Sequence, residues 1–272
     1  MRKMAGMVGG LAIPAVLLTV AVAVTTIGAQ EAVRPTAEEL AAITERGRML
    51  SEYDQAAWHA TDVVQMANPK TVEGQHNIAK KENGKWRVVF GRLNEERSRF
   101  AITCEAEQQA NPREFVVQKE PEELQDDGFF LFAARAIDVA MKDFGGANRP
   151  YNVAVLPGPA EQLYVYLYPA QTKARVYPLG GDVRYLVSAD GLNIVEKRQM
   201  HKTVIENAPS PKGKTVAGYH THVLSDVPED TDVFHVLTQD PPVPEFVGTA
   251  HFMYEVNADG TIKIQKEMKG KK

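Results

Sequence analysis

Two histidines stand one residue apart in the segment TVAGYHTHVLSDVPEDTDVF, residues 215–234. The residues before them predict a β-strand, in which alternate side chains project from one face, so His220 and His222 are expected to point the same way. An acidic turn follows, and then a short helix with Asp232 in its first turn. Two imidazoles and a carboxylate are ligands that zinc accepts, and three protein ligands leave a fourth position for water. The pattern therefore indicates a metal site, with the three groups expected within about 4–5 Å of one another.

The order of these residues resembles the JAMM metallopeptidase motif of the MPN fold, in which a strand carries His-x-His and the next helix begins with Ser-x-x-Asp. The resemblance covers residues 215–256 and implies that His220, His222 and Asp232 bind zinc in a peptidase. Two departures concern the chemistry. Glu229 stands in the place of the serine, and the glutamate that serves this family as general base has no recognisable counterpart upstream. Glu229 is therefore a candidate for the missing base, and equally a candidate to block the site.

Ordinary structural roles are the alternative for the same residues. The histidine pair can hydrogen-bond to the backbone or to Asp226, and a helix N-terminus favours acidic side chains in any protein because of its macrodipole. His235 follows three residues after Asp232 on the same side of the helix, so it is a candidate to support the ligands rather than to bind the ion.

Composition places the chain among globular proteins. Of its 272 residues, 24% are charged and 44% hydrophobic, and the formal net charge is −4. This balance gives no basic surface for nucleic acid, so a protein or small-molecule ligand is the expected partner. The single cysteine, Cys104, excludes an internal disulfide and is expected to be a buried side chain on a strand.

The first residues differ in kind from the rest. Arg2 and Lys3 precede a segment without any charge, Met4 to Gln30, which predicts an export signal in residues 1–29. The apolar run approaches the ~20 residues that span a bilayer, so an uncleaved anchor is the alternative. In either case the remaining chain is predicted to lie outside the cytoplasm, in the periplasm or secreted, with no further membrane segment.

Helices and strands alternate in a simple order along the remaining chain. A capping box at Thr36 and Glu39 opens a helix that ends before Pro69, and strands with a period of two follow it. A second apolar helix begins after the acidic segment 118–128, and more strands follow. The prediction is an α+β fold with antiparallel sheets and two helix-then-meander units, at about 37–107 and 127–205. Residues 118–128 are the expected linker between an N-terminal part, 30–117, and a C-terminal part, 129–268.

Two functions follow from these patterns. The first is an exported, soluble α+β protein that binds a ligand in the cell envelope or outside the cell, because the sequence contains no complete catalytic constellation. The second is a JAMM-like zinc hydrolase with His220, His222 and Asp232 as ligands. Whether the chain is an enzyme stays open at this level.

Overall fold

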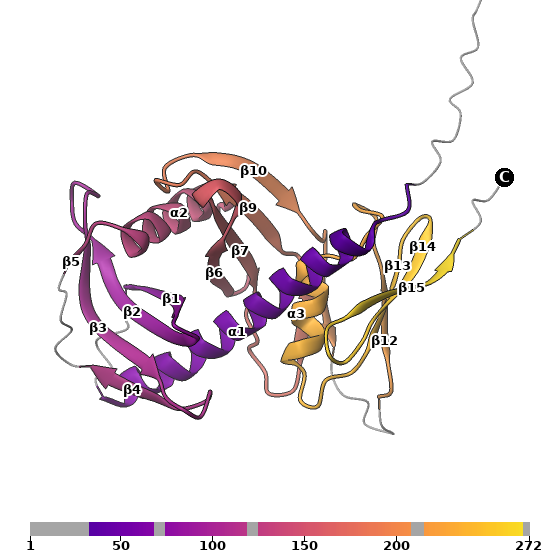
Figure 1. Cartoon of the computed structure of the whole chain (residues 1–272), viewed down its shortest axis with the longest axis horizontal. Helices are drawn as coiled ribbons and strands as arrows, with labels where there is room; N and C mark the ends of the chain where they lie inside the picture. Colours follow the sequence, from indigo (N-terminus) through magenta and orange to yellow (C-terminus); the bar gives the residue numbers. More distant parts are fainter. Residues whose placement is uncertain (1–32, 68–73, 119–124, 208–214, 269–272) are drawn as a thin grey trace, which may run out of the picture. The chain divides into compact units, whose positions relative to one another are not determined.

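The computed structural model describes residues 33–67, 74–118, 125–207 and 215–268 (Figure 1). Residues from Arg34 onward belong to one compact unit. The predicted export signal, residues 1–29, lies outside the described residues. No helix in the described ranges is both long and apolar enough to cross a membrane.

The first helix is followed by an antiparallel sheet. Helix α1 (Ala37–Ala67) begins with the predicted capping box, in which the Thr36 and Glu39 side chains each accept a hydrogen bond from the backbone N–H of the other residue, at 3.1 and 2.8 Å. Four strands then pair in chain order, with a short fifth strand beside β3: β1 (His76–Glu82), β2 (Lys85–Leu93), β3 (Phe100–Gln108), β4 (Phe115–Gln118) and β5 (Gln125–Asp126).

The second helix repeats this arrangement. After α2 (Phe129–Phe144), an antiparallel sheet has the order β6-β7-β9-β10, again the order of the chain. The strands of this sheet are β6 (Tyr151–Pro157), β7 (Leu163–Pro169), β9 (Val183–Val187) and β10 (Ile194–Gln199). A short 3₁₀ helix, η2 (Pro159–Glu161), lies between β6 and β7. Strands β8 (Tyr177–Gly180) and β11 (Val204–Asn207) form a separate pair. The predicted α+β class with two helix-then-meander units is therefore confirmed.

The C-terminal sheet carries the histidine pair. Its order is β12 (Gly218–Thr221), β13 (Glu245–Gly248), β14 (Phe252–Val256) and β15 (Ile262–Glu267). Helix α3 (Asp230–Thr238) connects β12 to β13, and these two strands are parallel, because a helical crossover returns the chain to the same end of the sheet. The other pairs are antiparallel, and a turn containing Asp259 and Gly260 joins β14 to β15.

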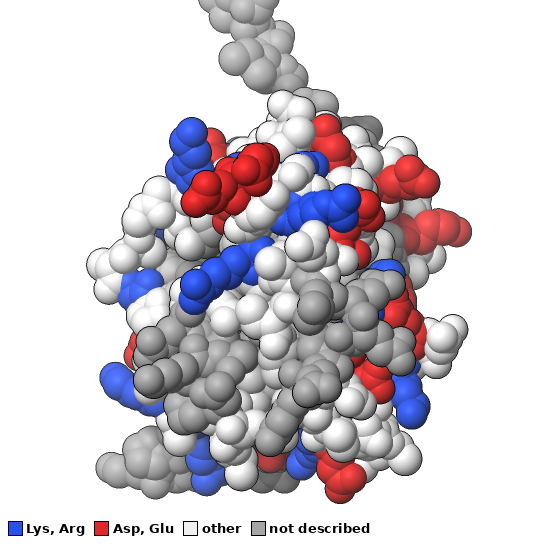
Figure 2. All heavy atoms as spheres, turned by 90° about the vertical axis from the view of Figure 1, so that its left-hand side faces the viewer, with Lys and Arg blue, Asp and Glu red and all other residues white. Residues whose placement is uncertain are grey.

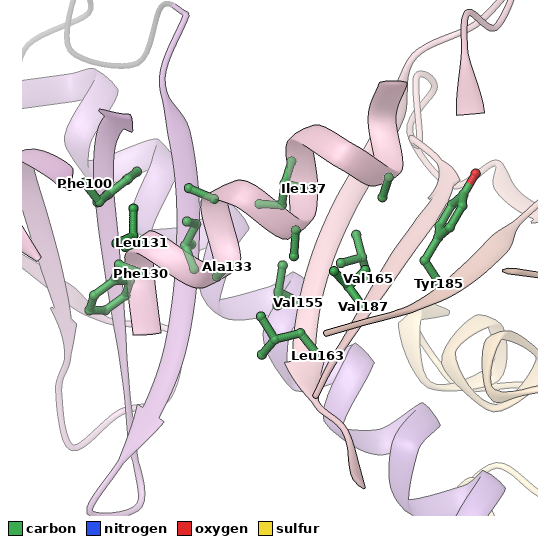
Figure 3. Packing of buried hydrophobic residues seen from close by; sticks show 14 of the residues in the cluster. Phe100, Phe130, Leu131, Ala133, Ile137, Val155, Leu163, Val165, Tyr185 and Val187 are labelled. Atoms are coloured by element: carbon green, nitrogen blue, oxygen red, sulfur yellow. The ribbon is translucent and has the colours of Figure 1, made fainter. Parts of the chain in front are cut away.

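Two apolar clusters hold the two helix-then-meander units together. Figure 3 shows Leu131 and Ile137 of α2 between Phe100 of β3 and the strand residues Val155 and Val165. The second cluster contains Tyr53 of α1, Met200 after β10, and buried side chains from both sheets, Val88, Phe90, Cys104, Tyr166 and Tyr168 among others. Both clusters thus combine side chains from before and after the acidic segment. Residues 119–124 of the predicted linker lie outside the described residues, so its role stays a prediction.

Charged side chains of both signs are mixed on the surface. Figure 2 shows one face on which lysine and arginine are interspersed with aspartate and glutamate over the described part. Several form exposed ion pairs, such as Lys81 with Glu52 at 2.5 Å and Arg97 with Asp138 at 2.7 Å. Such pairs contribute about 0–1 kcal/mol each, so the fold depends on its buried clusters instead.

Helix α1 also reaches α3 and the C-terminal sheet (Figure 1). The contact is very close at Gly47, where an added Cβ would lie 2.5 Å from the Cβ of Val233 and 2.6 Å from the backbone oxygen of Asp230. Only a glycine allows the two helices to approach this far. Hydrogen bonds from Arg48 to the Asp259 carbonyl and from Thr44 to the Gly260 carbonyl, the first at 2.7 Å and the second at 3.2 Å, extend the contact.

We expect Gly47→Ala to destabilise the protein by about 1–3 kcal/mol because the new methyl group has no space between α1 and α3. In an unconstrained helix the same change stabilises by about 1 kcal/mol, so the sign itself is informative. Urea unfolding measures the effect. Gly146→Ala is the control, since a Cβ there meets no atom within 4 Å. An unchanged or increased midpoint for Gly47→Ala would contradict the packing.

Candidate metal centre

Four side chains from three parts of the fold meet in one buried place. His220 lies on β12, His222 follows the end of that strand, and Asp232 is in the first turn of α3. The structure therefore brings together the three ligands that the sequence predicts. It adds a fourth, His201, which follows β10. One donor atom from each lies within 4.8 Å of all the others, so the group could hold a metal ion.

The donor atoms lie close enough to one another to surround a single ion. The Nε2 atom of His222 lies 2.8 Å from that of His201 and 3.1 Å from that of His220. Asp232 Oδ1 is 3.1 Å from the Nε2 atoms of His201 and His220, and its Oδ2 is 3.2 Å from that of His222. Ligands at about 2.0–2.1 Å from a tetrahedral zinc ion are about 3.3–3.4 Å apart. An expansion of a few tenths of an ångström would fit the ion.

Hydrogen bonds to the outer ring nitrogens decide which nitrogen faces the centre as an acceptor. The Nδ1 atom of His222 is 3.0 Å from the Val227 carbonyl oxygen, which can only accept, so Nδ1 carries the hydrogen. In a neutral ring the Nε2 atom of His222 then has a lone pair directed inward. The Ser225 hydroxyl donates to the same carbonyl at 2.7 Å and fixes its position.

The other two rings are oriented by carboxylates. The Nδ1 atom of His201 is 2.7 Å from Asp182, and that of His220 is 2.9 Å from Glu245. Both carboxylates are almost completely buried. A histidine that binds a metal commonly donates its other N–H to a carboxylate or a carbonyl, which fixes the tautomer and strengthens the ligand. All three rings have this arrangement.

Asp232 divides its two oxygens between the helix and the centre. Oδ2 accepts a hydrogen bond of 2.7 Å from the backbone N–H of Glu229, which closes the capping box of α3. Oδ1 is fully buried and, when the rings of His201 and His220 are neutral, it has no donor, although both ring nitrogens are 3.1 Å away. A buried carboxylate oxygen without a donor is unfavourable, and a cation in the centre would satisfy it.

A second buried carboxylate fixes the start of α3. Asp230 is 1% exposed and binds Arg46 of α1 at 2.9 Å, Arg184 of β9 at 2.5 Å and the Tyr166 hydroxyl of β7 at 2.8 Å. These partners join α3 to both the first helix and the second sheet. Because Asp232 is only two residues further on, the same contacts also determine where its carboxylate lies.

His201 is the ligand that sequence reasoning missed, and a glycine turn positions it. Gly180 and Gly181 have φ values of +85° and +69°. A Cβ on Gly180 would lie 2.3 Å from the Thr203 carbonyl oxygen and 3.1 Å from His201 Cβ. The next residue, Asp182, binds the His201 ring. The segment PLGGD at 178–182 was therefore the sequence signal for this ligand, through the two adjacent glycines and the aspartate that follows them.

The remaining predicted residues have other contacts. Glu229 is buried, and both its carboxylate oxygens bind Arg198, at 2.7 and 3.0 Å. Burial raises the pKa of Glu229 and the Arg198 charge opposes this. Thus the candidate base is held by an arginine and lies outside the four-donor group. His235 is buried on α3 and also outside the group; burial lowers its pKa. Asp226 binds His251 at 2.7 Å rather than either histidine of the pair.

Without a metal ion, protons have to supply the positive charge in the centre. Burial works against the charged form of His201, but the carboxylates of Asp182 and Asp232 outweigh it and raise its pKa to about 11. Burial likewise opposes charge on His220, while Asp232 and Glu245 raise its pKa to about 9. The pKa of Asp232 is lowered in spite of its burial, because the histidines around it favour the carboxylate. A metal cation would displace these protons.

No match to this chain was found among protein-family models, curated proteins or solved structures. The resemblance of residues 215–256 to the JAMM motif therefore stays a prediction.

We expect Glu245→Gln to weaken metal binding about 10- to 100-fold, because the amide keeps the hydrogen bond to His220 but removes the charge that strengthens this ligand. Competition with a chromogenic chelator measures the affinity. Asp138→Asn is the matched control, since Asp138 also contacts a histidine, His76 at 3.2 Å, but outside the group. Equal affinities for both variants would show that Glu245 does not act on a ligand.

We also expect metal binding at pH 7 to release about two protons, because His201 and His220 are protonated below their raised pKa values and must lose a proton to bind an ion. Titration calorimetry in buffers of different ionisation enthalpy counts them. The number should fall as the pH rises past 9, where His220 has already lost its proton. A binding enthalpy that does not depend on the buffer at pH 7 would contradict the assignment.

Proposed function

We propose that this chain is an exported zinc-binding protein whose ion is held by His201, His220, His222 and Asp232. The observation that carries the proposal is the inward direction of the donors. Each ring donates its Nδ1 hydrogen outward, so each neutral ring turns an Nε2 lone pair toward the buried Asp232 carboxylate. Lone pairs at 2.8–3.2 Å repel one another unless protons or a metal cation lie between them, and a single metal ion would satisfy all four donors at once.

Zinc fits this donor set better than other common ions. Three imidazoles and one carboxylate in a tetrahedral arrangement suit zinc, whereas calcium and magnesium prefer six or more oxygen ligands. Copper and nickel also bind imidazole but favour square-planar or tetragonal sites. The donor set of three imidazoles and one carboxylate therefore supports zinc.

A closed set of four protein ligands is typical of structural sites. His201 belongs to the chain after β10, whereas the other ligands belong to β12 and α3. A bound ion would thus connect the second antiparallel sheet to the C-terminal sheet. We infer that zinc binding stabilises the contact between these parts, in addition to the Arg184–Asp230 pair.

Export is supported by the sequence alone. Arg2 and Lys3 precede the uncharged segment Met4–Gln30, and the chain has no disulfide that would report its compartment independently. Binding and retention of zinc in the cell envelope is the role that combines both proposals. Fractionation of cells that express the full chain tests the location, and recovery in the cytoplasm would contradict it.

A zinc hydrolase of the JAMM type is the second candidate. The order His220, His222, Asp232 favours it, since these are the ligands that the motif implies. A hydrolytic zinc site needs an open coordination position and a group that accepts a proton. In this chain the Nε2 atom of His201 would take the fourth coordination position of the ion, and Arg198 holds the carboxylate of Glu229. These two contacts place the hydrolase second.

We expect the purified chain to retain zinc after dialysis, and the double variant His220→Ala/His222→Ala to contain none, because two of four ligands are removed. Elemental analysis of both samples measures this. The control is His76→Ala/His251→Ala, which removes two histidines that contact carboxylates outside the group. Negligible zinc in the unaltered chain would end the proposal. Metal-dependent turnover of peptide or ester substrates by the zinc-loaded chain would favour the second candidate instead.

A further inference from the structure

The four donors do not belong to one structural element. His220, His222 and Asp232 fall within thirteen consecutive residues, 220–232, and this segment is a strand, a turn and the start of a helix. His201 comes from a different sheet. Three ligands are therefore arranged by local structure, and the fourth reaches the site only through the packing of one part of the chain on another.

The His201 ring is also the least enclosed of the four. Its side chain is 9% exposed, compared with 4% for His220, 1% for His222 and 0% for Asp232. Its partner Asp182 lines a small pocket together with Gly180, Thr231 and Phe234. The site is thus least enclosed on the side of His201.

The backbone at His201 is fixed, so any movement belongs to the ring. The Gln199 side chain donates to the His201 carbonyl at 2.6 Å, and the Met200 N–H donates to the Asp182 carbonyl at 3.1 Å. The ring itself has one outer hydrogen bond, to Asp182. A turn about the Cα–Cβ and Cβ–Cγ bonds, with loss of that bond, is enough to withdraw Nε2 from the centre.

We propose that His201 is an exchangeable ligand: His220, His222 and Asp232 hold the ion by themselves, and the His201 ring gives up its position to an incoming ligand. The inference rests on the proposed metal binding and deepens it. In the exchange the bond from the ion to His201 Nε2 breaks and a bond to the new donor forms, without electron transfer. The carboxylate of Asp182 then faces the vacated space, so a ligand that donates a hydrogen bond to it, as imidazole does through its N–H, fits better than one without a donor.

Cobalt(II) makes the exchange visible, because its visible absorption depends on coordination number and geometry. We expect the unaltered chain to bind cobalt with the strong absorption of a tetrahedral site. His201→Ala should still retain cobalt, with a changed spectrum, and added imidazole should restore the original spectrum. His222→Ala is the matched variant from the three-residue set; it should lose cobalt, and imidazole should not restore binding.

A thiol tests the exchange in the unaltered chain. 2-Mercaptoethanol binds cobalt as the thiolate, and in the unaltered chain its proton passes to the Nε2 atom that His201 withdraws from the ion. A sulfur-to-cobalt charge-transfer band should therefore appear, at a lower concentration for His201→Ala than for the unaltered chain. A band that forms in His201→Ala but at no concentration in the unaltered chain would show that His201 does not exchange. Equal loss of cobalt from His201→Ala and His222→Ala, both folded by circular dichroism, would show that His220, His222 and Asp232 do not hold the ion by themselves.

The two proposals fail in different ways. If the unaltered chain binds no cobalt or zinc, the proposed function is wrong and the exchange has no site. If it binds the ion but His201 does not exchange, the function stands with a permanently closed site. Should His201→Ala not fold, His201→Gln replaces it, since the longer amide keeps a polar group beside Asp182.

Discussion

The structure around the candidate centre depends on one electrostatic constraint. Three imidazole nitrogens and the Asp232 carboxylate share one buried space, where neighbouring acceptor atoms are 2.8–3.2 Å apart and repel one another strongly because the dielectric constant is low. Positive charge in the middle removes the repulsion, whether it comes from protons or from a metal ion. The raised pKa values of His201 and His220 are one consequence of this requirement, and the capacity of the group to hold a metal ion is another.

The surroundings of the centre are built to hold this charge. Asp182 and Glu245 bind the outer nitrogens of two rings, while Asp230 and Glu229 bind arginines and fix the start of α3. Each buried carboxylate outside the centre therefore has a defined partner. The arginine pairs of Asp230 and Glu229 hold the start of α3 rigidly, because the removal of these partners would leave a buried charge unpaired. The rigidity supports a site that keeps its geometry when protons replace the metal ion.

Local rules predicted one part of this arrangement from the sequence and missed another. Strand alternation and helix capping were enough for His220, His222 and Asp232, because these residues are close in sequence. The two helix-then-meander units followed from periodicity for the same reason. His201 and the Arg198–Glu229 pair depend on how the second sheet packs against α3, about twenty to thirty residues away along the chain. The parallel pairing of β12 with β13 was also missed, since it is set by the crossover helix.

Strand β12 lies at the edge of its sheet and pairs only with β13 among the described strands. A short edge strand is weakly constrained, and a shift by one residue would exchange its two faces. In this chain such a shift would turn both imidazoles outward and bring Tyr219 and Thr221 to the inner side. An ion bound by His220 and His222 would select one register of β12 against β13. The bound ion would therefore also stabilise the pairing at this edge of the sheet.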